Sequence, residues 1–248
     1  MLTINHLTKH YKGSNKGVTD VSLHVEPGDI YAFIGHNGAG KTTTLKCIAG
    51  IHGFESGEIF IGGQSILKNV LACKKKFAYI PDNPDLYEYL TGIQYLNFVA
   101  DIFEVGIPER EQRIGQYADA FEITASLGDL ISTYSHGMKQ KLAIISALVH
   151  HPKLLILDEP FVGLDPKAAV ILKNIMRNIC ADGGAIFFST HVLDVAEKLC
   201  NKVAIIKDGV LIAQGNMEEI VKEGQYLPEI VLLLRFLPCF PVQSKHHP

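Results

Sequence analysis

The sequence of 248 residues has no marked excess of charge of either sign. It contains 23 Lys and Arg residues against 26 Asp and Glu residues, which gives a formal net charge of -3 at pH 7. Proteins that bind nucleic acid as their main task usually carry a basic excess, so we expect no nucleic-acid partner. The opening residues, 1–6, do not have the pattern of a secretory signal peptide.

Long apolar runs, paired cysteines and internal repeats are also missing. No run approaches the ~20 apolar residues that a membrane-spanning helix needs, so another chain would have to supply any spanning part. The five cysteines are scattered without Cys-x-x-Cys spacing. Cysteines scattered in this way favour reduced thiols in a reducing compartment over a zinc site or a disulfide framework. The remaining composition is that of a globular protein with enough apolar residues for a core.

The most informative stretch is a glycine-rich loop at residues 35–43, the phosphate loop. It lies between an apolar strand at 31–34 and a helix predicted at 41–49. Glycines let the backbone curl so that successive N–H groups face an anion, and the helix start adds unpaired donors and partial positive charge. Lys41 is placed to reach the β- and γ-phosphates of a nucleotide, and the Thr42 hydroxyl to bind Mg²⁺. The expected phosphate-binding residues are Gly35, His36, Asn37, Gly38, Ala39, Gly40, Lys41, Thr42 and Thr43.

Two carboxylates form a second motif, because Asp158 and Glu159 follow directly on the apolar run 154–157. Ligand sites in open α/β sheets lie at the carboxyl ends of the strands. We expect Asp158 to hold Mg²⁺ and Glu159 to act as the general base for the water that attacks the γ-phosphate. Alone, the pair could be a solvated acidic turn; downstream of a phosphate loop, the catalytic interpretation is favoured.

The order of predicted elements indicates an α/β fold. Apolar strands such as 154–157 and 185–188 are typical of a parallel sheet that is covered on both faces. The other strands are predicted at residues 2–7, 18–25, 31–34 and 77–80, with hairpins over 58–66 and 203–213. The helices beyond 41–49 are predicted at 91–103, 108–121, 135–150, 165–180, 192–200 and 216–224. We therefore predict a nucleotide-binding core of 1–82 and 151–215, a helical lobe of 83–150, and a C-terminal helix and tail of 216–248.

A third motif, the signature segment of residues 134–141, precedes the strand at 154–157 by a single helix. Its sequence is Tyr134-Ser135-His136-Gly137-Met138-Lys139-Gln140-Lys141. Together with the phosphate loop and Asp158-Glu159, it resembles the signature of ATP-binding cassette (ABC) ATPases, and the resemblance covers roughly residues 1–220. It implies a P-loop NTPase core with a mostly parallel sheet, an N-terminal antiparallel β subdomain and an inserted α-helical subdomain. The local sequence is most similar to separate ATPase subunits of bacterial exporters.

The resemblance extends to three further residues. Asp165 lies in a segment similar to the D-loop of the family, and His191 matches its switch histidine at the γ-phosphate. Tyr11 stands where the family stacks an aromatic ring on adenine, although by itself it could cap the first pair of strands. The family's signature usually reads Leu-Ser-Gly-Gly-Gln; here Ser135 and Gly137 match, whereas His136 and Met138 do not.

Asp82 is a second departure from the family pattern, which usually has a glutamine at this strand end. That glutamine touches Mg²⁺ and senses the membrane partner. An aspartate also offers an oxygen to Mg²⁺, so we expect Asp82 to be a metal ligand together with Thr42 and Asp158. The alternative is a solvated turn residue ahead of Asn83 and Pro84.

The resemblance implies an ATPase that uses ATP and Mg²⁺ and energises a membrane transporter. Each ATP would lie between two ATPase subunits, either two copies or two related chains, with Ser135, His136 and Gly137 of one covering the γ-phosphate in the other. The implied location is cytoplasmic, peripheral on the inner face of the cell membrane, next to a separate permease.

Two other functions are open at this point. A soluble ABC ATPase that acts on ribosomes or DNA usually joins two cassettes by a charged linker or carries a coiled-coil insertion, and this sequence has neither. A P-loop kinase or GTPase would leave the signature segment unexplained, and the Asn-Lys-x-Asp pattern that reads guanine is missing.

Overall fold

Two β-sheets organise the chain, and the structure, a computed structural model, describes residues 1–13 and 16–224 of it. Sheet A is antiparallel and has the order β2-β1-β4-β5. Its strands are β1 Leu2–His10, β2 Gly17–Val25, β4 Ser56–Ile61 and β5 Gln64–Ser65. β4 and β5 form the predicted hairpin.

Sheet B has the order β10-β9-β3-β8-β7-β6 and is parallel except for the hairpin of β9 and β10. Its strands are β3 Ile30–Ile34, β6 Phe77–Ile80, β7 Leu154–Asp158, β8 Ala185–Thr190, β9 Lys202–Lys207 and β10 Val210–Asn216. The predicted fold class, a mostly parallel sheet with an antiparallel sheet near the N-terminus, is confirmed.

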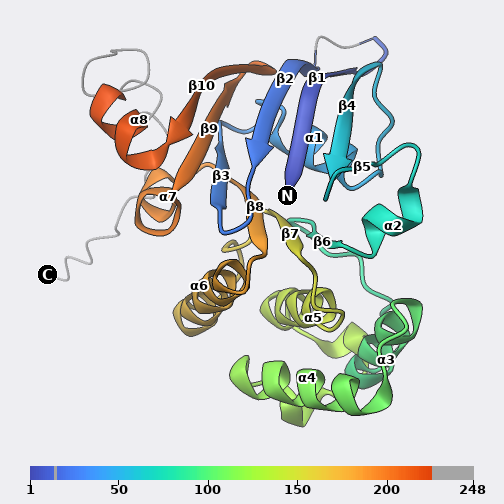
Figure 1. Cartoon of the computed structure of the whole chain (residues 1–248). Coiled ribbons are helices and arrows are strands. Elements are labelled where there is room, and N and C mark those ends of the chain that lie inside the picture. Colours follow the sequence, from blue (N-terminus) through green and yellow to red (C-terminus); the bar gives the residue numbers. More distant parts are fainter. Residues whose placement is uncertain (14–15, 225–248) are drawn as a thin grey trace, which may run out of the picture.

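Helices cover sheet B, and α3 to α5 gather at the end of the molecule away from sheet A (Figure 1). The helices are α1 Lys41–Ile48, α2 Val70–Lys74, α3 Gly92–Ile102, α4 Ile107–Ala120, α5 His136–Leu148, α6 Pro166–Ala181, α7 Leu193–Leu199 and α8 Met217–Gly224. Helix α2 was not predicted, because five residues are too few to show a helical period. Residues 225–248 of the predicted C-terminal tail lie outside the described residues.

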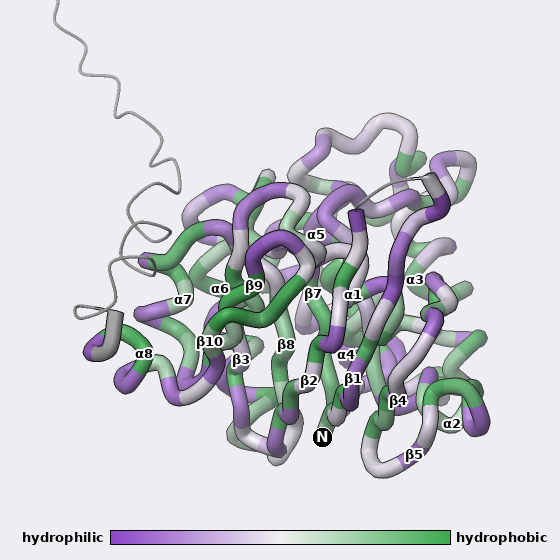
Figure 2. The backbone as a smooth tube through the Cα atoms, turned by 90° about the horizontal axis from the view of Figure 1, so that it is seen from above, coloured by the Kyte–Doolittle hydropathy of each residue, from purple (hydrophilic) through white to green (hydrophobic). Residues whose placement is uncertain are grey.

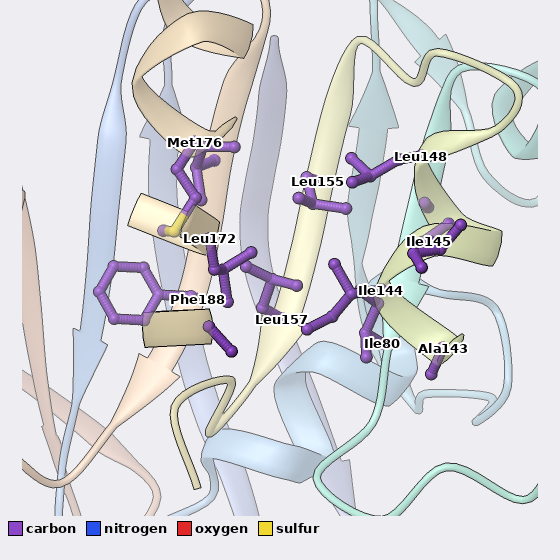
Figure 3. Packing of buried hydrophobic residues seen from close by; sticks show 14 of the residues in the cluster. Ile80, Ala143, Ile144, Ile145, Leu148, Leu155, Leu157, Leu172, Met176 and Phe188 are labelled. Atoms are coloured by element: carbon purple, nitrogen blue, oxygen red, sulfur yellow. The ribbon is translucent and has the colours of Figure 1, made fainter. Parts of the chain in front are cut away.

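Side chains of sheet B alternate between two hydrophobic cores, because neighbouring residues of a strand point to opposite faces. Leu155, Leu157 and Phe188 pack with Ile144 of α5 and Leu172 of α6 in one core (Figure 3). Tyr31, Phe33, Leu154, Ile156 and Phe187 pack on the other side, with α1 and sheet A. In Figure 2, β7 and β8 appear as mostly hydrophobic segments in the middle of the molecule.

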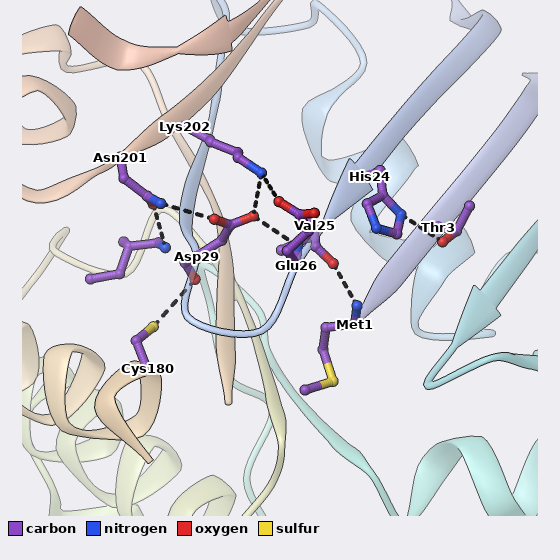
Figure 4. A network of polar contacts seen from close by, with 10 residues as sticks. Met1, Thr3, His24, Val25, Glu26, Asp29, Cys180, Asn201 and Lys202 are labelled. Carbon is purple, nitrogen blue, oxygen red and sulfur yellow. Dashed lines mark hydrogen bonds and ion pairs between the residues drawn. The ribbon is translucent and has the colours of Figure 1, made fainter. Parts of the chain in front are cut away.

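A polar network around the buried Asp29 fixes the start of β3, the strand that leads into the phosphate loop (Figure 4). The Asp29 carboxylate accepts hydrogen bonds from the Glu26 backbone N–H (2.7 Å) and from Asn201 Nδ2 (2.9 Å). Lys202 Nζ lies 3.1 Å from the same carboxylate. Asn201 Oδ1 in turn accepts from the Ile30 backbone N–H (2.8 Å). These contacts hold the beginnings of β3 and β9 together.

No helix within residues 1–13 and 16–224 is both long and apolar enough to cross a membrane.

Candidate nucleotide-binding site

The phosphate loop joins β3 to α1, as predicted, and its glycines are required by its shape. Gly38 and Gly40 have φ angles of +86° and +109°, which residues other than glycine rarely adopt. Gly40 also packs tightly, because a Cβ atom there would lie 2.5 Å from Val18 Cγ1. Helix α1 begins directly after Gly40, so its unpaired backbone N–H groups adjoin the loop.

Lys41 lies at the centre of this arrangement, with only 6% of its side chain exposed. Its Nζ donates hydrogen bonds to the backbone oxygens of Gly35 (2.7 Å) and His36 (3.3 Å). The same ammonium lies 3.4 Å from Glu159 Oε1. A buried cation is therefore fixed beside the loop, at the place where an anionic ligand would need it.

A cavity of about 270 Å³ opens beside the phosphate loop. Its lining residues are Tyr11, Lys16, Gly17, Asn37, Gly38, Gly40, Lys41, Thr42, Thr43, Asp82 and Glu159. Tyr11 is half-exposed at the rim, with its hydroxyl 3.3 Å from Thr43 Oγ1. Lys16 and Gly17 were not predicted to be here, because no signal in the sequence shows that the start of β2 lies against the loop.

Asp158 is buried at the end of β7, and its two carboxylate oxygens differ. Oδ1 accepts a hydrogen bond from Ser189 Oγ (2.5 Å), whereas Oδ2 is buried without a hydrogen-bond partner among the described residues. Burial raises the pKa of Asp158, and the neighbouring Ser189 and Thr42 side chains partly offset this. An open carboxylate oxygen near the Thr42 side chain offers the oxygen ligands that fit Mg²⁺.

Glu159 is held in an unusual backbone conformation, with a φ of +47°. Its backbone N–H donates to Ser189 Oγ (3.0 Å). Its carboxylate lies between two basic groups, with Oε2 3.0 Å from His191 Nδ1 and Oε1 3.4 Å from Lys41 Nζ. Ser189 thus contacts both acidic residues. Ser189 was not among the predicted site residues, although Ser189 and Thr190 are polar residues that end an apolar strand just ahead of His191.

Asp82 follows β6 and reaches the same cavity, where its side chain also raises the pKa of Asp158. Its Oδ1 accepts a hydrogen bond from the backbone N–H of Asn83 (2.9 Å). The position agrees with both interpretations of Asp82, because this hydrogen bond is typical of a turn and the residue also lines the cavity together with Thr42.

The signature segment lies elsewhere and does not line this cavity. Ser135 caps α5 by accepting a hydrogen bond from the Met138 backbone N–H (3.3 Å). The His136 ring packs so closely on Gly163 that a Cβ atom there would lie 2.7 Å from it. Lys141 Nζ lies 2.8 Å from Asp165 Oδ2, and this contact, with a backbone hydrogen bond from Ala168, lowers the pKa of Asp165. The predicted site residues therefore form two separate groups, one around the phosphate-loop cavity and one at the starts of α5 and α6.

Comparison with known proteins identifies the family. Residues 18–162 match the family described as "ABC transporter". The chain is 34% identical over 220 residues to the ABC-type transporter ATP-binding protein EcsA of Bacillus subtilis (strain 168), covering 89% of each chain. It is 35% identical over 227 residues to the bacitracin transport ATP-binding protein BcrA of Bacillus licheniformis, covering 91% of this chain and 73% of BcrA.

Solved structures agree with this result. A structure described as an ATP-binding subunit of an ABC transporter has a TM-score of 0.88 and 35% sequence identity, with 95% of this chain and 99% of that chain covered. The ATP-binding cassette MJ0796, described as a dimer bound to ADP and Pi, shares the fold with a TM-score of 0.80, 21% identity and coverage of 88% and 99%.

The fold and the loop at the end of β3 define a P-loop nucleotide-binding protein. More narrowly, the chain belongs to the ABC transporter family and is an ATP-binding component of such a transporter. The kinase and GTPase alternatives are thereby dismissed.

Proposed function

We propose that this chain hydrolyses ATP with Mg²⁺ as cofactor and couples the reaction to substrate movement by a separate membrane permease. The observation that carries the proposal is the place of Glu159. Its carboxylate lies 3.4 Å from Lys41 Nζ and 3.0 Å from His191 Nδ1, at the wall of the phosphate-loop cavity. A base between a phosphate-binding cation and a histidine is the arrangement that water activation needs.

Binding of ATP falls to the phosphate loop, with Lys41 and the start of α1 neutralising the β- and γ-phosphates. Tyr11 at the rim stacks on the adenine ring. Thr42, Asp82 and Asp158 would hold Mg²⁺, which would supply positive charge beside the phosphates. The open Oδ2 of Asp158 supports this assignment.

Hydrolysis depends on Glu159, which accepts a proton from the attacking water. Its positive φ and the hydrogen bond from its backbone N–H to Ser189 fix the carboxylate relative to Asp158. His191 contacts the same carboxylate and is placed to donate to the γ-phosphate. The described residues near the cavity include no arginine that could stabilise the transition state, so the remaining charge stabilisation comes from outside this chain.

A second ATPase subunit, either another copy or a related chain, completes the site. The separation of Ser135, His136, Gly137 and Asp165 from the cavity supports this step. The start of α5 is capped by Ser135 and exposed, so it is free to cover the γ-phosphate held by a partner subunit. ATP then favours the closed pair because it contacts both halves only when they are together.

The helical lobe transmits the closure to the permease. We retain the division into a nucleotide-binding core of 1–82 and 151–215, a lobe of 83–150, and a C-terminal helix and tail of 216–248. An apolar cavity of about 310 Å³ between β6 and the lobe supports the docking of a permease segment. Pro81 and Pro84, which flank the proposed metal ligand Asp82, line it together with Tyr95 and Phe103. This function places the chain on the cytoplasmic face of the cell membrane.

The substitution Glu159→Gln tests the proposal, because it removes the base and keeps the shape of the side chain. We expect ATP binding to persist and hydrolysis to fall by about 10²- to 10⁴-fold. The variant should also accumulate as an ATP-dependent dimer. Phosphate release and size-exclusion chromatography with ATP and Mg²⁺ measure both effects. Rapid turnover by the variant would contradict the role of Glu159, and a strictly monomeric variant would contradict the shared site.

A further inference from the structure

The segment between β5 and β6 exposes apolar and basic side chains together. Leu67, Val70 and Leu71 have exposed fractions of 65%, 41% and 77%. Residues 59–81 also contain four lysines and no aspartate or glutamate. Figure 1 shows helix α2, which carries part of the segment, on the outside of the molecule at the edge beside β5. This basic-apolar surface consists of six exposed residues: Leu67, Lys68, Val70, Leu71, Lys74 and Lys75.

Two buried residues anchor the segment to the core beside sheet A. Ile66 and Cys73 have exposed fractions of 3% and 0% and belong to the same hydrophobic core as the strands of sheet A. Residues three and four apart on a helix are neighbours, so Leu71 of α2 lies beside Lys74 and Lys75. The apolar and the basic side chains are therefore presented side by side from an anchored segment.

Little negative charge balances these lysines within the described residues. Of the four lysines in residues 59–81, only Lys75 takes part in an ion pair with the part of the chain that the structure describes, through Glu104 Oε2 at 2.8 Å. Both side chains of this pair are exposed, so it contributes little to stability. Lys76 Nζ instead donates to the backbone oxygen of Gly62 (3.4 Å). The charges of Lys68 and Lys74 are thus available to an anionic partner outside the chain.

We propose that the basic-apolar surface binds an anionic membrane, with its lysines at lipid phosphates and Leu67 and Leu71 inserted among the headgroups. Lysine is depleted at protein–protein interfaces, whereas lysines next to exposed leucines are typical of segments that lie on anionic membranes. Lys74 also lines the apolar cavity between β6 and the helical lobe, so the surface adjoins the region proposed for permease docking. The inference rests on the proposed function for the location at a membrane and not for ATP hydrolysis.

The experiment measures co-sedimentation of the full chain, without nucleotide, with vesicles of phosphatidylcholine and with vesicles of equal parts phosphatidylcholine and phosphatidylglycerol. We expect binding to the anionic vesicles only, weakened by added salt. Lys68→Gln and Lys74→Gln together should weaken it by about fivefold for each lysine. Leu67→Ser and Leu71→Ser together should weaken it by about tenfold. All four side chains are exposed, so the melting temperature should stay close to that of the wild type. Equal binding to both kinds of vesicle, or to neither, overturns the proposal.

A matched control removes the same charge elsewhere. Lys198 of α7 and Lys222 of α8 are exposed at the opposite edge of the molecule in Figure 1. Lys198→Gln with Lys222→Gln should bind anionic vesicles as the wild type does; an equal loss in this control would make net charge the cause and overturn the proposal.

Two further results separate this inference from its alternatives. Glu159→Gln should bind the vesicles as strongly as the wild type, so a failure of the proposed hydrolysis leaves the vesicle test intact. The Lys68 and Lys74 substitutions could instead leave vesicle binding unchanged and prevent co-purification with a multi-span membrane protein. That result would assign the surface to the permease interface and overturn the proposal.

Discussion

At the scale of single residues, the two carboxylates of the site are organised by one hydroxyl. Ser189 Oγ donates to Asp158 Oδ1 and accepts from the Glu159 backbone N–H. The serine is fully buried at the end of β8, so its hydroxyl has no water to replace these partners. Ser189 therefore positions Asp158 through the carboxylate of Asp158, and Glu159 through the backbone N–H of Glu159.

We expect Ser189→Ala to lower the free energy of unfolding by about 1–3 kcal/mol, because the substitution leaves buried polar groups of Asp158 and Glu159 without a partner. The rate of ATP hydrolysis should fall as well, since both carboxylates lose a contact that positions them. Denaturant unfolding and phosphate release measure the two effects. Ser146→Ala is the matched control: its hydroxyl is also buried but donates to the Ala143 backbone oxygen, away from the site. Equal hydrolysis rates in the two variants would contradict a positioning role for Ser189.

At the scale of elements, His150 joins the end of α5 to β6 and to the residue that follows α3. Its Nε2 lies 3.3 Å from the backbone oxygen of Phe77, and its ring stacks on Phe103 with the ring centroids 3.7 Å apart. Burial lowers the pKa of His150 to about 4, which the contact with the Phe77 oxygen partly offsets. The junction of helical lobe and sheet thus depends on a neutral imidazole.

This contact predicts acid sensitivity. Because the pKa of His150 is lower in the folded protein than in the unfolded chain, the unfolded state binds more protons in between. Stability should be highest above the ordinary histidine pKa of about 6.5 and should fall by up to about 3 kcal/mol as pH decreases toward 4. Denaturant unfolding over this range measures the loss, which His150→Gln should reduce. His151→Gln, at the exposed neighbouring residue, is the control. If it reduced the acid-induced loss of stability as much as His150→Gln does, the assignment of that loss to His150 would be refuted.

At the scale of the whole molecule, the residues that match the ABC family motifs form two groups, which lie apart within this chain. The phosphate-loop cavity contains Lys41 and Glu159, while Ser135 and Asp165 lie with α5 and α6. This separation is the reason for proposing a two-subunit site. It also allows the assembly to be tested by a substitution outside the cavity, introduced into the Glu159→Gln variant.

The substitution Ser135→Asp provides that test, because aspartate caps a helix about as well as serine does. The start of α5 should stay folded, with a melting temperature close to that of the wild type. A carboxylate would, however, face the γ-phosphate of the partner subunit, so ATP-driven dimerisation of Glu159→Gln should be lost when both substitutions are present. Ser135→Asn, the neutral cap, should keep more of the dimer. Full dimerisation of the Ser135→Asp double variant would refute the proposed contact.

Much of the fold could be predicted because most strands and helices have a recognisable local sequence pattern. The predicted strand at 77–80 matches β6, and the helices at 91–103, 108–121 and 135–150 match α3, α4 and α5 within a few residues. Helix α2 escaped prediction because it is short. Of the site, the sequence indicated the phosphate loop and the acidic residues at the end of β7, since both depend on patterns of neighbouring residues.

The contacts between distant parts of the chain required the tertiary structure. Ser189 is separated from Asp158 by helix α6, and Asp208 is far along the chain from His36; their contacts arise only when β3, β7, β8 and β9 line up in sheet B. The sequence alone determined that the chain binds nucleotide phosphates, because a glycine loop between a strand and a helix is a local structure. Which side chains join that site, and which lie away from it, depended on the order of the strands, which no local pattern encodes.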